Sequence, residues 1–243
     1  MSCQLLNDYI LKLGNDTYKV LGVWEQGSKV YGYGDTFSDE DYVVVWENGY
    51  PKKGSRETLL RQCKVAQIKA KDHTNKASDK FSAENVTYNV VHLTGNDDFF
   101  ELFKEINSAP ANEDHLYRLG GFIRANILYD PQRKLKNYKD TVKVTSEILQ
   151  NYKESRKSTI KNNIEWLRTS AKRKHTVDCI KCLNFLLVTL IIIQYLENNQ
   201  FPIPVKWFEK ESEKFGWQET NIFKVVSTIK ERVPFEDIIK YFS

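Results

Sequence analysis

The sequence lacks the features of an exported or disulfide-rich protein. It has four cysteines in 243 residues, and its opening segment, MSCQLLNDYILKLGND, shows no basic region followed by a small-residue cleavage site. We therefore expect reduced thiols and a cytoplasmic location. Cys179 and Cys182 follow His175 at a spacing that metal sites can use. A zinc site normally needs a fourth ligand, so small buried residues are the favoured interpretation.

The sequence also lacks a long uninterrupted apolar run and a marked excess of charge. The most apolar stretch, residues 182–196, contains Asn184, Thr189 and Gln194. It is shorter than the roughly twenty residues of a membrane span, so we expect a buried helix and no membrane contact. Thirty-six basic residues are opposed by thirty-two acidic ones, and the mild net charge of +4 does not by itself predict nucleic-acid binding. An apolar content of 41% with 28% charged residues argues against a disordered or fibrous chain.

Two kinds of hydrophobic pattern divide the chain near residue 112. Before this point short apolar runs alternate with helical segments, which predicts an α/β (α+β) domain over residues 1–112 with a small mixed sheet. The polar residues 69–83 are interpreted as an exposed connection. Residues 113–243 keep a helical period, so we predict an all-α helical bundle there, with residues 177–196 at its centre. The strands are expected at residues 19–24, 42–46 and 86–93, and the helices at residues 56–64, 99–106, 116–128, 135–153, 160–171, 177–197, 205–215, 221–232 and 235–242.

The residues that indicate a chemical function lie in one short segment, residues 27–41. Asp39 and Asp41 are separated by one residue where an apolar strand begins, so both side chains point to the same face of that strand. Mg²⁺ takes hard oxygen ligands, commonly one or two carboxylates with water and substrate phosphates. Upstream, Gly27 and Ser28 form a turn where backbone N–H groups and a hydroxyl can approach a phosphate, because glycine has no Cβ. A cation and a triphosphate would therefore meet at this corner.

The order of these residues resembles the polymerase-β-type nucleotidyltransferase superfamily, in particular its minimal and antibiotic-modifying branches. The resembling features are an apolar strand, Gly27-Ser28, a glycine-containing spacer, Ser38-Asp39-x-Asp41 and a second apolar strand. The resemblance implies that Asp39 and Asp41 are catalytic and hold Mg²⁺ or Mn²⁺. It also implies that Gly27 and Ser28 bind a nucleoside triphosphate, with ATP as the expected substrate.

One position departs from the family's pattern. A third carboxylate on a later, adjacent strand usually completes the metal site, and the residue that aligns with it here is Asn89. An amide oxygen can ligate a cation, so the resemblance implies metal ligation by Asn89. The amide cannot accept the proton of an attacking hydroxyl, and the general base stays unassigned. Acids that flank the strand could substitute for the missing carboxylate: Asp79, Glu84, Asp97 and Asp98.

The second half resembles helical domains appended to such enzymes, at residues 127–135 and 196–208. This resemblance implies that Lys206 could meet a nucleotide phosphate. A solvated lysine beside Trp207 is an equally compatible interpretation.

These residues predict metal-dependent transfer of an adenylyl group from a nucleoside triphosphate to a hydroxyl. The acceptor is a small molecule, such as the aminoglycosides or lincosamides modified in antibiotic resistance, or it is a protein. Nucleic acid is not expected as the acceptor, because no aromatic residues interrupt the basic patches. The alternative is a catalytically impaired nucleotide-binding or protein-interaction module that retains the fold, which Asn89 favours. The oligomeric state is not set by the sequence.

Overall fold

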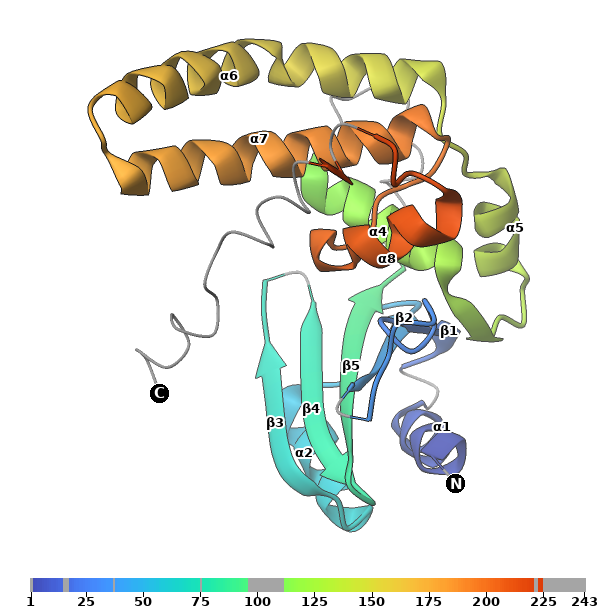
Figure 1. Ribbon diagram of the computed structural model, residues 1–243. Helices are drawn as coiled ribbons and strands as arrows, with labels where there is room; N and C mark the ends of the chain where they lie inside the picture. The colour runs from blue at the N-terminus through green and yellow to red at the C-terminus, as the bar shows by residue number, and fades with distance from the viewer. Residues whose placement is uncertain are drawn as a thin grey trace. The chain divides into compact units, whose positions relative to one another are not determined.

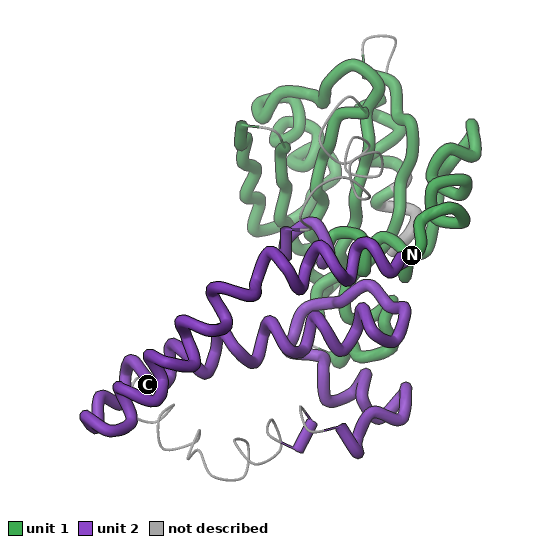
Figure 2. The backbone as a smooth tube through the Cα atoms, turned by 90° about the horizontal axis from the view of Figure 1, so that it is seen from above, with its two compact units in different colours: residues 1–109, 118–143 green, residues 110–117, 144–243 purple. Residues whose placement is uncertain are grey.

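The computed structural model describes residues 2–14, 18–36, 38–74, 76–95, 112–220 and 223–224. The chain forms two compact units, residues 1–109 with 118–143 and residues 110–117 with 144–243 (Figure 2). The limit at residue 112 between two functional domains stays a prediction. The helices expected at residues 99–106 and 235–242 lie outside the described residues, as does most of the one expected at 221–232.

The first unit is built on a mixed sheet. Within the described residues its six strands lie in the order β3-β4-β5-β2-β1-β6. Strands β2 and β5 are parallel, and the other neighbouring pairs are antiparallel. The predicted fold class, an α/β sheet unit followed by helices, is confirmed. The strands are β1 (Val20–Gln26), β2 (Glu40–Trp46), β3 (Ala66–Asp72), β4 (Ala77–Ala83), β5 (Val86–Thr94) and β6 (Asn126–Tyr129).

Two segments of this sheet differ from the prediction. Residues 69–83, expected to be an exposed connection, instead form most of the β3–β4 hairpin. Strand β4 buries Ala77, Asp79 and Phe81 on one face, and because one of these is an acid, the alternation does not show as an apolar pattern. The helix expected over residues 116–128 ends at Arg124, and the four-residue edge strand β6 follows.

Helices cover both faces of the sheet (Figure 1). Helices α1 (Ser2–Leu13) and α2 (Lys53–Gln62) pack on one face against a core that includes Val44, Trp46 and Val90. On the other face, α4 (Glu113–Arg124) and α5 (Lys134–Thr141) contribute residues to a second core. That core contains Trp24, Val43, Val45, Phe122, Ala125 and Leu135. Because side chains alternate along β2, Asp41 lies on the same face as Val43 and Val45.

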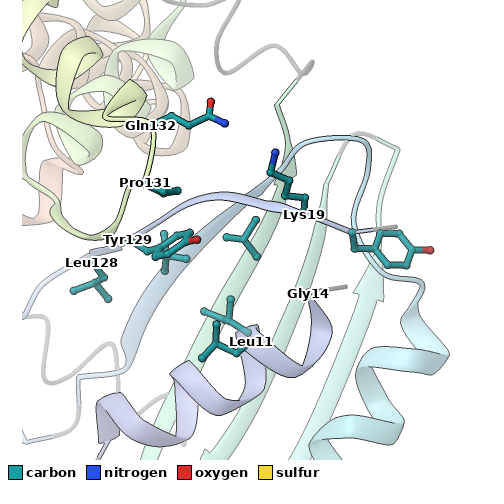
Figure 3. Close-up of a pocket in the computed structure, with 11 residues that line it drawn as sticks. Leu11, Gly14, Lys19, Leu128, Tyr129, Pro131 and Gln132 are labelled. Carbon is teal, nitrogen blue, oxygen red and sulfur yellow. The ribbon is translucent and has the colours of Figure 1, made fainter. Parts of the chain in front are cut away.

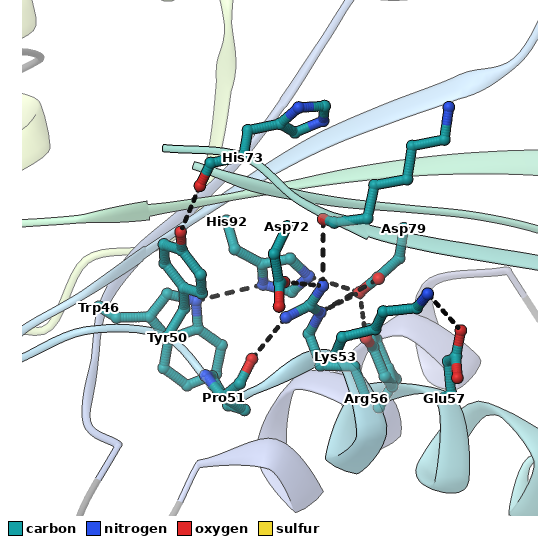
Figure 4. A network of polar contacts seen from close by, with 12 residues as sticks. Trp46, Tyr50, Pro51, Lys53, Arg56, Glu57, Asp72, His73, Asp79 and His92 are labelled. Atoms are coloured by element: carbon teal, nitrogen blue, oxygen red, sulfur yellow. Dashed lines mark hydrogen bonds and ion pairs between the residues drawn. The ribbon is translucent and has the colours of Figure 1, made fainter. Parts of the chain in front are cut away.

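A buried polar network ties the first face together (Figure 4). Asp79 of β4 accepts hydrogen bonds from Arg56 Nε (3.1 Å) and from the Tyr9 hydroxyl (2.5 Å). It also contacts His92 Nε2 at 2.7 Å, and the Trp46 indole donates to His92 Nδ1 at 3.2 Å. With Nδ1 accepting, His92 is neutral and Nε2 donates to Asp79. Burial opposes ionisation of Asp79, but hydrogen bonding from His92 and Tyr9 and the charge of Arg56 lower its pKa. Burial also lowers the pKa of His92.

The second unit contains two long helices, α6 (Ser146–Lys172) and α7 (Thr176–Glu197), that pack against each other. The sequence pattern predicts helices at residues 135–153 and 160–171. Instead the chain leaves α5 at Thr141, and Thr145 caps α6 by accepting a hydrogen bond from Ile148 N at 3.2 Å. The short helices η1 (Val205–Trp207) and α8 (Phe208–Phe215) follow.

Helix α7 is less buried than the sequence suggests. Its C-terminal part buries Ile191, Ile192 and Leu196, whereas Val177 and Ile180 near its start are 65% and 60% exposed. Among the described residues, α7 is the one helix whose length and composition would suffice to cross a membrane. The expectation of a stretch too short for a span is therefore wrong, since the helix continues on both sides of residues 182–196. The core helix of a globular protein meets the same criteria.

Candidate functional site

Strand pairing brings the predicted site residues into one row across the sheet. Asp41 of β2 lies opposite Gln26 of β1 on one side and opposite Asn89 of β5 on the other. Asn89 in turn lies opposite Lys80 of β4. Paired residues share a face of the sheet. The row therefore places a carboxylate, an amide and an ammonium group side by side, with Asp39 immediately before β2.

A single amide joins the two carboxylates. Asn89 Nδ2 donates to Asp39 Oδ2 at 2.8 Å and to Asp41 Oδ1 at 3.0 Å. Lys80 Nζ forms an ion pair with Asp39 Oδ2 at 2.9 Å. Partial burial of Asp39 opposes its ionisation, but the hydrogen bonds from Lys80 and Asn89 lower its pKa below the ordinary value. The Asp39 carboxyl is therefore charged at neutral pH, and both carboxylates lie within reach of one atom.

The Gly27–Ser28 turn lies directly against this pair. Gly27 has a φ of +92°, which favours glycine, and a Cβ added there would collide with the Asp41 carboxylate. The turn is closed by hydrogen bonds from Tyr31 N to Gly27 O (3.1 Å) and from Tyr33 N to Ser28 O (2.8 Å). The turn that the sequence predicts therefore lies directly against the Asp41 carboxylate.

Side-chain contacts also fix the path of the chain into β2. Ser38 Oγ donates to Asp35 Oδ1 at 2.8 Å and accepts from Asp35 N at 2.9 Å. Lys29, in the turn after Ser28, forms an ion pair with Glu40 at 3.3 Å. These contacts hold the turn next to the start of β2, so the residues on both sides of Asp39 are fixed.

The donor set at this site fits one divalent cation. Within the described ranges, no group of three or more His, Cys, Asp or Glu side chains could hold a metal ion. Two carboxylates suffice for Mg²⁺ when substrate phosphates and water complete its shell. A pair of cations would need another acid where Asn89 stands. Asn89 presents its NH₂ group to the carboxylates, and a half-turn of the amide would present Oδ1 instead, so its role as a ligand stays a prediction.

The sequence did not indicate Lys80 as a site residue, and it indicated a phosphate contact for Lys206 only through the resemblance of the second half. Lys80 lies in the polar residues interpreted as an exposed connection, and because the buried Asp79 is an acid, no local pattern there indicates a strand. Lys206 belongs to the second unit, where its ammonium lies 5.0 Å from the centroid of the Trp207 ring. That contact is a cation–π interaction. Nucleotide binding by Lys206 stays a prediction.

A cavity of about 740 Å³ lies away from the carboxylates (Figure 3). Helix α1, the first half of β1 and the segment around β6 line it, with Leu11, Val20 and Tyr129 among the lining residues. Strand β1 meets Asp41 at Gln26, which is its other end. The lining is largely apolar, and its lysine, Lys19, forms an ion pair with Glu47 at 3.4 Å. The cavity therefore lies apart from the row of polar residues.

Comparison with known proteins adds one structural likeness. No family model matches the chain, and no curated protein matches its sequence. Among solved structures, a nucleotidyltransferase-like protein from Exiguobacterium sibiricum 255-15 is similar, with 12% sequence identity and a TM-score of 0.46. The match covers 94% of this chain and 67% of that one. A likeness at this level carries no functional conclusion, and the proposals below stand on the geometry of the site.

Proposed function

We propose that the chain is a nucleotidyltransferase that moves a nucleotidyl group, expected to be adenylyl, from a nucleoside triphosphate to an acceptor hydroxyl. One observation carries the proposal: two carboxylates, bridged by a single amide nitrogen, lie against a glycine turn with positive φ. A site of this kind can hold a divalent cation and a phosphate chain next to each other.

The chain's own residues would divide the work as follows. Asp39 and Asp41 would hold Mg²⁺ or Mn²⁺, which when bound supplies charge neutralisation and polarisation at the phosphates. The backbone of the Gly27 turn and the Ser28 hydroxyl would bind the outer phosphates and fix the direction of the leaving group. The acceptor oxygen bonds to the α-phosphorus, the bond from that phosphorus to the bridging oxygen breaks, and pyrophosphate leaves with the electron pair. The hydroxyl proton passes to water, because Asn89 cannot accept it.

A second function is favoured by the same contacts. Asn89 donates to both carboxylates and Lys80 pairs with Asp39, so positive and donor groups already satisfy the acids without a cation. The site would then bind a nucleotide, or a protein partner, without catalysis. The two functions differ in whether pyrophosphate is released.

Separate measurements of binding and turnover distinguish these functions. Binding of ATP with and without Mg²⁺ is followed by calorimetry, and release of pyrophosphate is measured with candidate antibiotics and with cell extract. The proposal predicts Mg²⁺-dependent binding, labelled product in one acceptor pool, and loss of product in Asp41→Asn. Asp140→Asn, an exposed change on α5, is the matched control and should retain activity. Binding without product in any pool would favour the non-catalytic module.

A further inference from the structure

Three lysines share the sheet face that carries the carboxylate pair. They belong to the β3–β4 hairpin, which lies beside β5 (Figure 1). Within the hairpin Lys69 lies directly opposite Lys80, and Lys71 lies opposite Ser78. The register continues from Lys80 to Asn89, so these side chains lie on the same face as Asn89 and Asp41. The three lysines are exposed, and together with Ser78 and Asn89 they line a cavity of about 230 Å³.

This arrangement of like charges is unfavourable without a ligand. Lysines directly opposite each other on neighbouring strands repel. Asp39 compensates Lys80, whereas in the described part of the chain the ammonium groups of Lys69 and Lys71 form no ion pair with an acid. Lysines on an edge strand such as β3 can discourage pairing with other chains. Lys80, however, lies on the interior strand β4, where protection of an edge gives no reason for a positive charge.

The position of Lys69 and Lys71 on β3 separates them from the nucleotide turn, whereas Lys80 on β4 reaches Asp39 at 2.9 Å. Across the sheet the order runs from the turn after β1, through Asp41 and Asn89, to Lys80 and Lys69. Neighbouring strands are about 4.8 Å apart, so the backbones of β1 and β3 are separated by roughly 19 Å. A triphosphate held at the turn is shorter than this distance. Lys69 and Lys71 therefore face whatever binds on the far side of the carboxylates, which is where an acceptor would lie, and Lys80 lies between them and Asp39.

We propose that Lys69, Lys71 and Lys80 bind the phosphate group of a small phosphorylated acceptor. This inference rests on the proposed function and assigns its acceptor class. A cavity of about 230 Å³ is smaller than the ~300–1,000 Å³ typical of sites for drug-sized ligands, and it suits a phosphate with a small polyol. A polycationic acceptor such as an aminoglycoside would meet charge of its own sign. The three ammonium groups thus favour an anion, and the phosphate directs its hydroxyl towards the carboxylate pair.

Calorimetric titration with ribose 5-phosphate tests the proposal on the full-length protein. The probe should bind at low salt and more weakly at physiological salt, whereas ribose should not bind. The double variant Lys69→Gln/Lys71→Gln should lose affinity for the probe by on the order of tenfold or more. Lys12→Gln/Lys64→Gln removes the same charge from exposed positions near the helices of the other face, and should change the affinity little. Equal binding of ribose, or equal weakening in both double variants, would overturn the proposal.

Titration with a non-hydrolysable triphosphate and Mg²⁺ separates this inference from the proposed function. If the wild type binds the triphosphate and Lys69→Gln/Lys71→Gln loses only the sugar phosphate, both stand. If the double variant loses the triphosphate equally, the lysines hold the nucleotide itself and the acceptor assignment is wrong. If the wild type binds the sugar phosphate but no triphosphate, the proposed function fails while a phosphate site remains. Much tighter, steeply salt-dependent binding of a single-stranded oligonucleotide would overturn the small-molecule assignment.

Discussion

Changing Asn89 to aspartate adds the carboxylate that would allow a second cation, and it removes the donor that holds the existing pair. In the wild type the amide nitrogen donates to Asp39 at 2.8 Å and to Asp41 at 3.0 Å. In Asn89→Asp an anionic oxygen would face two other anionic oxygens. The folded state should therefore lose stability when no cation is present.

The size of this loss follows from the contacts. A hydrogen bond to a charged group contributes about 1.5–3 kcal/mol, and two are removed. Two unit charges about 4 Å apart near a protein surface interact with about 4 kcal/mol, although solvent reduces this here because the Asp39 side chain is 31% exposed. Water also replaces part of the lost hydrogen bonding at this partly exposed site, so we expect a net cost of about 2–4 kcal/mol, which is less than the sum of these contributions. For a chain of this size the midpoint of thermal unfolding should fall by roughly 5–15 °C.

The assay is thermal unfolding followed by circular dichroism, with EDTA and with excess Mg²⁺. Asn89→Asp should be destabilised in EDTA and should recover most of the loss with Mg²⁺, because the cation neutralises the added charge. Asn89→Ala is the matched control: it loses both donors, adds no charge, and should recover much less. Unfolding of Asn89→Asp at the wild-type temperature in EDTA, or equal recovery of both variants with Mg²⁺, would refute the reasoning.

Three further predictions concern the turn and the buried network. Gly27→Ala should lower the free energy of unfolding by about 1–3 kcal/mol and weaken triphosphate binding, because the added Cβ meets the Asp41 carboxylate and φ is positive at this residue. Calorimetry of nucleotide binding checks this prediction, and an unchanged affinity would contradict it. Asp79→Ala should destabilise the fold by about 3–5 kcal/mol, measured by urea unfolding, because it leaves the buried Arg56 guanidinium without its inner partner. Burial lowers the pKa of His92 from 6.5, so the unfolded chain binds its proton first and stability should fall as the pH drops below 6.5. Urea midpoints across this range should fall less in His92→Gln, and equal slopes would argue against the assignment.

The acid side of the profile should contain a second step. The pKa of Asp79 is lowered from 3.8 in the folded state, so the stability contributed by its ionised form is present above this value and is lost as the pH falls through the folded pKa. The steps of His92 and Asp79 have the same sign, and both make the protein less stable in acid.

Local spacing accounts for the part of the site that the sequence predicts. Asp39 and Asp41 share a face through the period of a strand, and the antiparallel pairing of β1 with β2, which follow each other in the chain, brings Gly27 to Asp41. The apolar pattern of residues 86–93 predicts the strand, the family resemblance singles out Asn89 within it, and the parallel β2–β5 register puts Asn89 opposite Asp41.

Long-range pairing accounts for what the sequence does not predict. The buried positions of β4 include an acid that is satisfied by Arg56 on α2 and His92 on β5, and no local pattern shows that these residues meet. Without β4, the place of Lys80 beside Asn89 cannot be inferred. Strand β6 also depends on long-range pairing. Its four residues continue an apolar helical pattern in the sequence, and they pair with β1 only in the folded chain.

Binding of a non-hydrolysable nucleoside triphosphate to the wild type and to Asp39→Asn/Asp41→Asn, each with Mg²⁺ and with EDTA, tests the central claim most directly. The account predicts binding that requires Mg²⁺ in the wild type and is lost in the double variant, while circular dichroism shows both proteins folded. Binding of equal strength in EDTA, or its full retention in the folded double variant, would contradict a cation and nucleotide site at these two carboxylates.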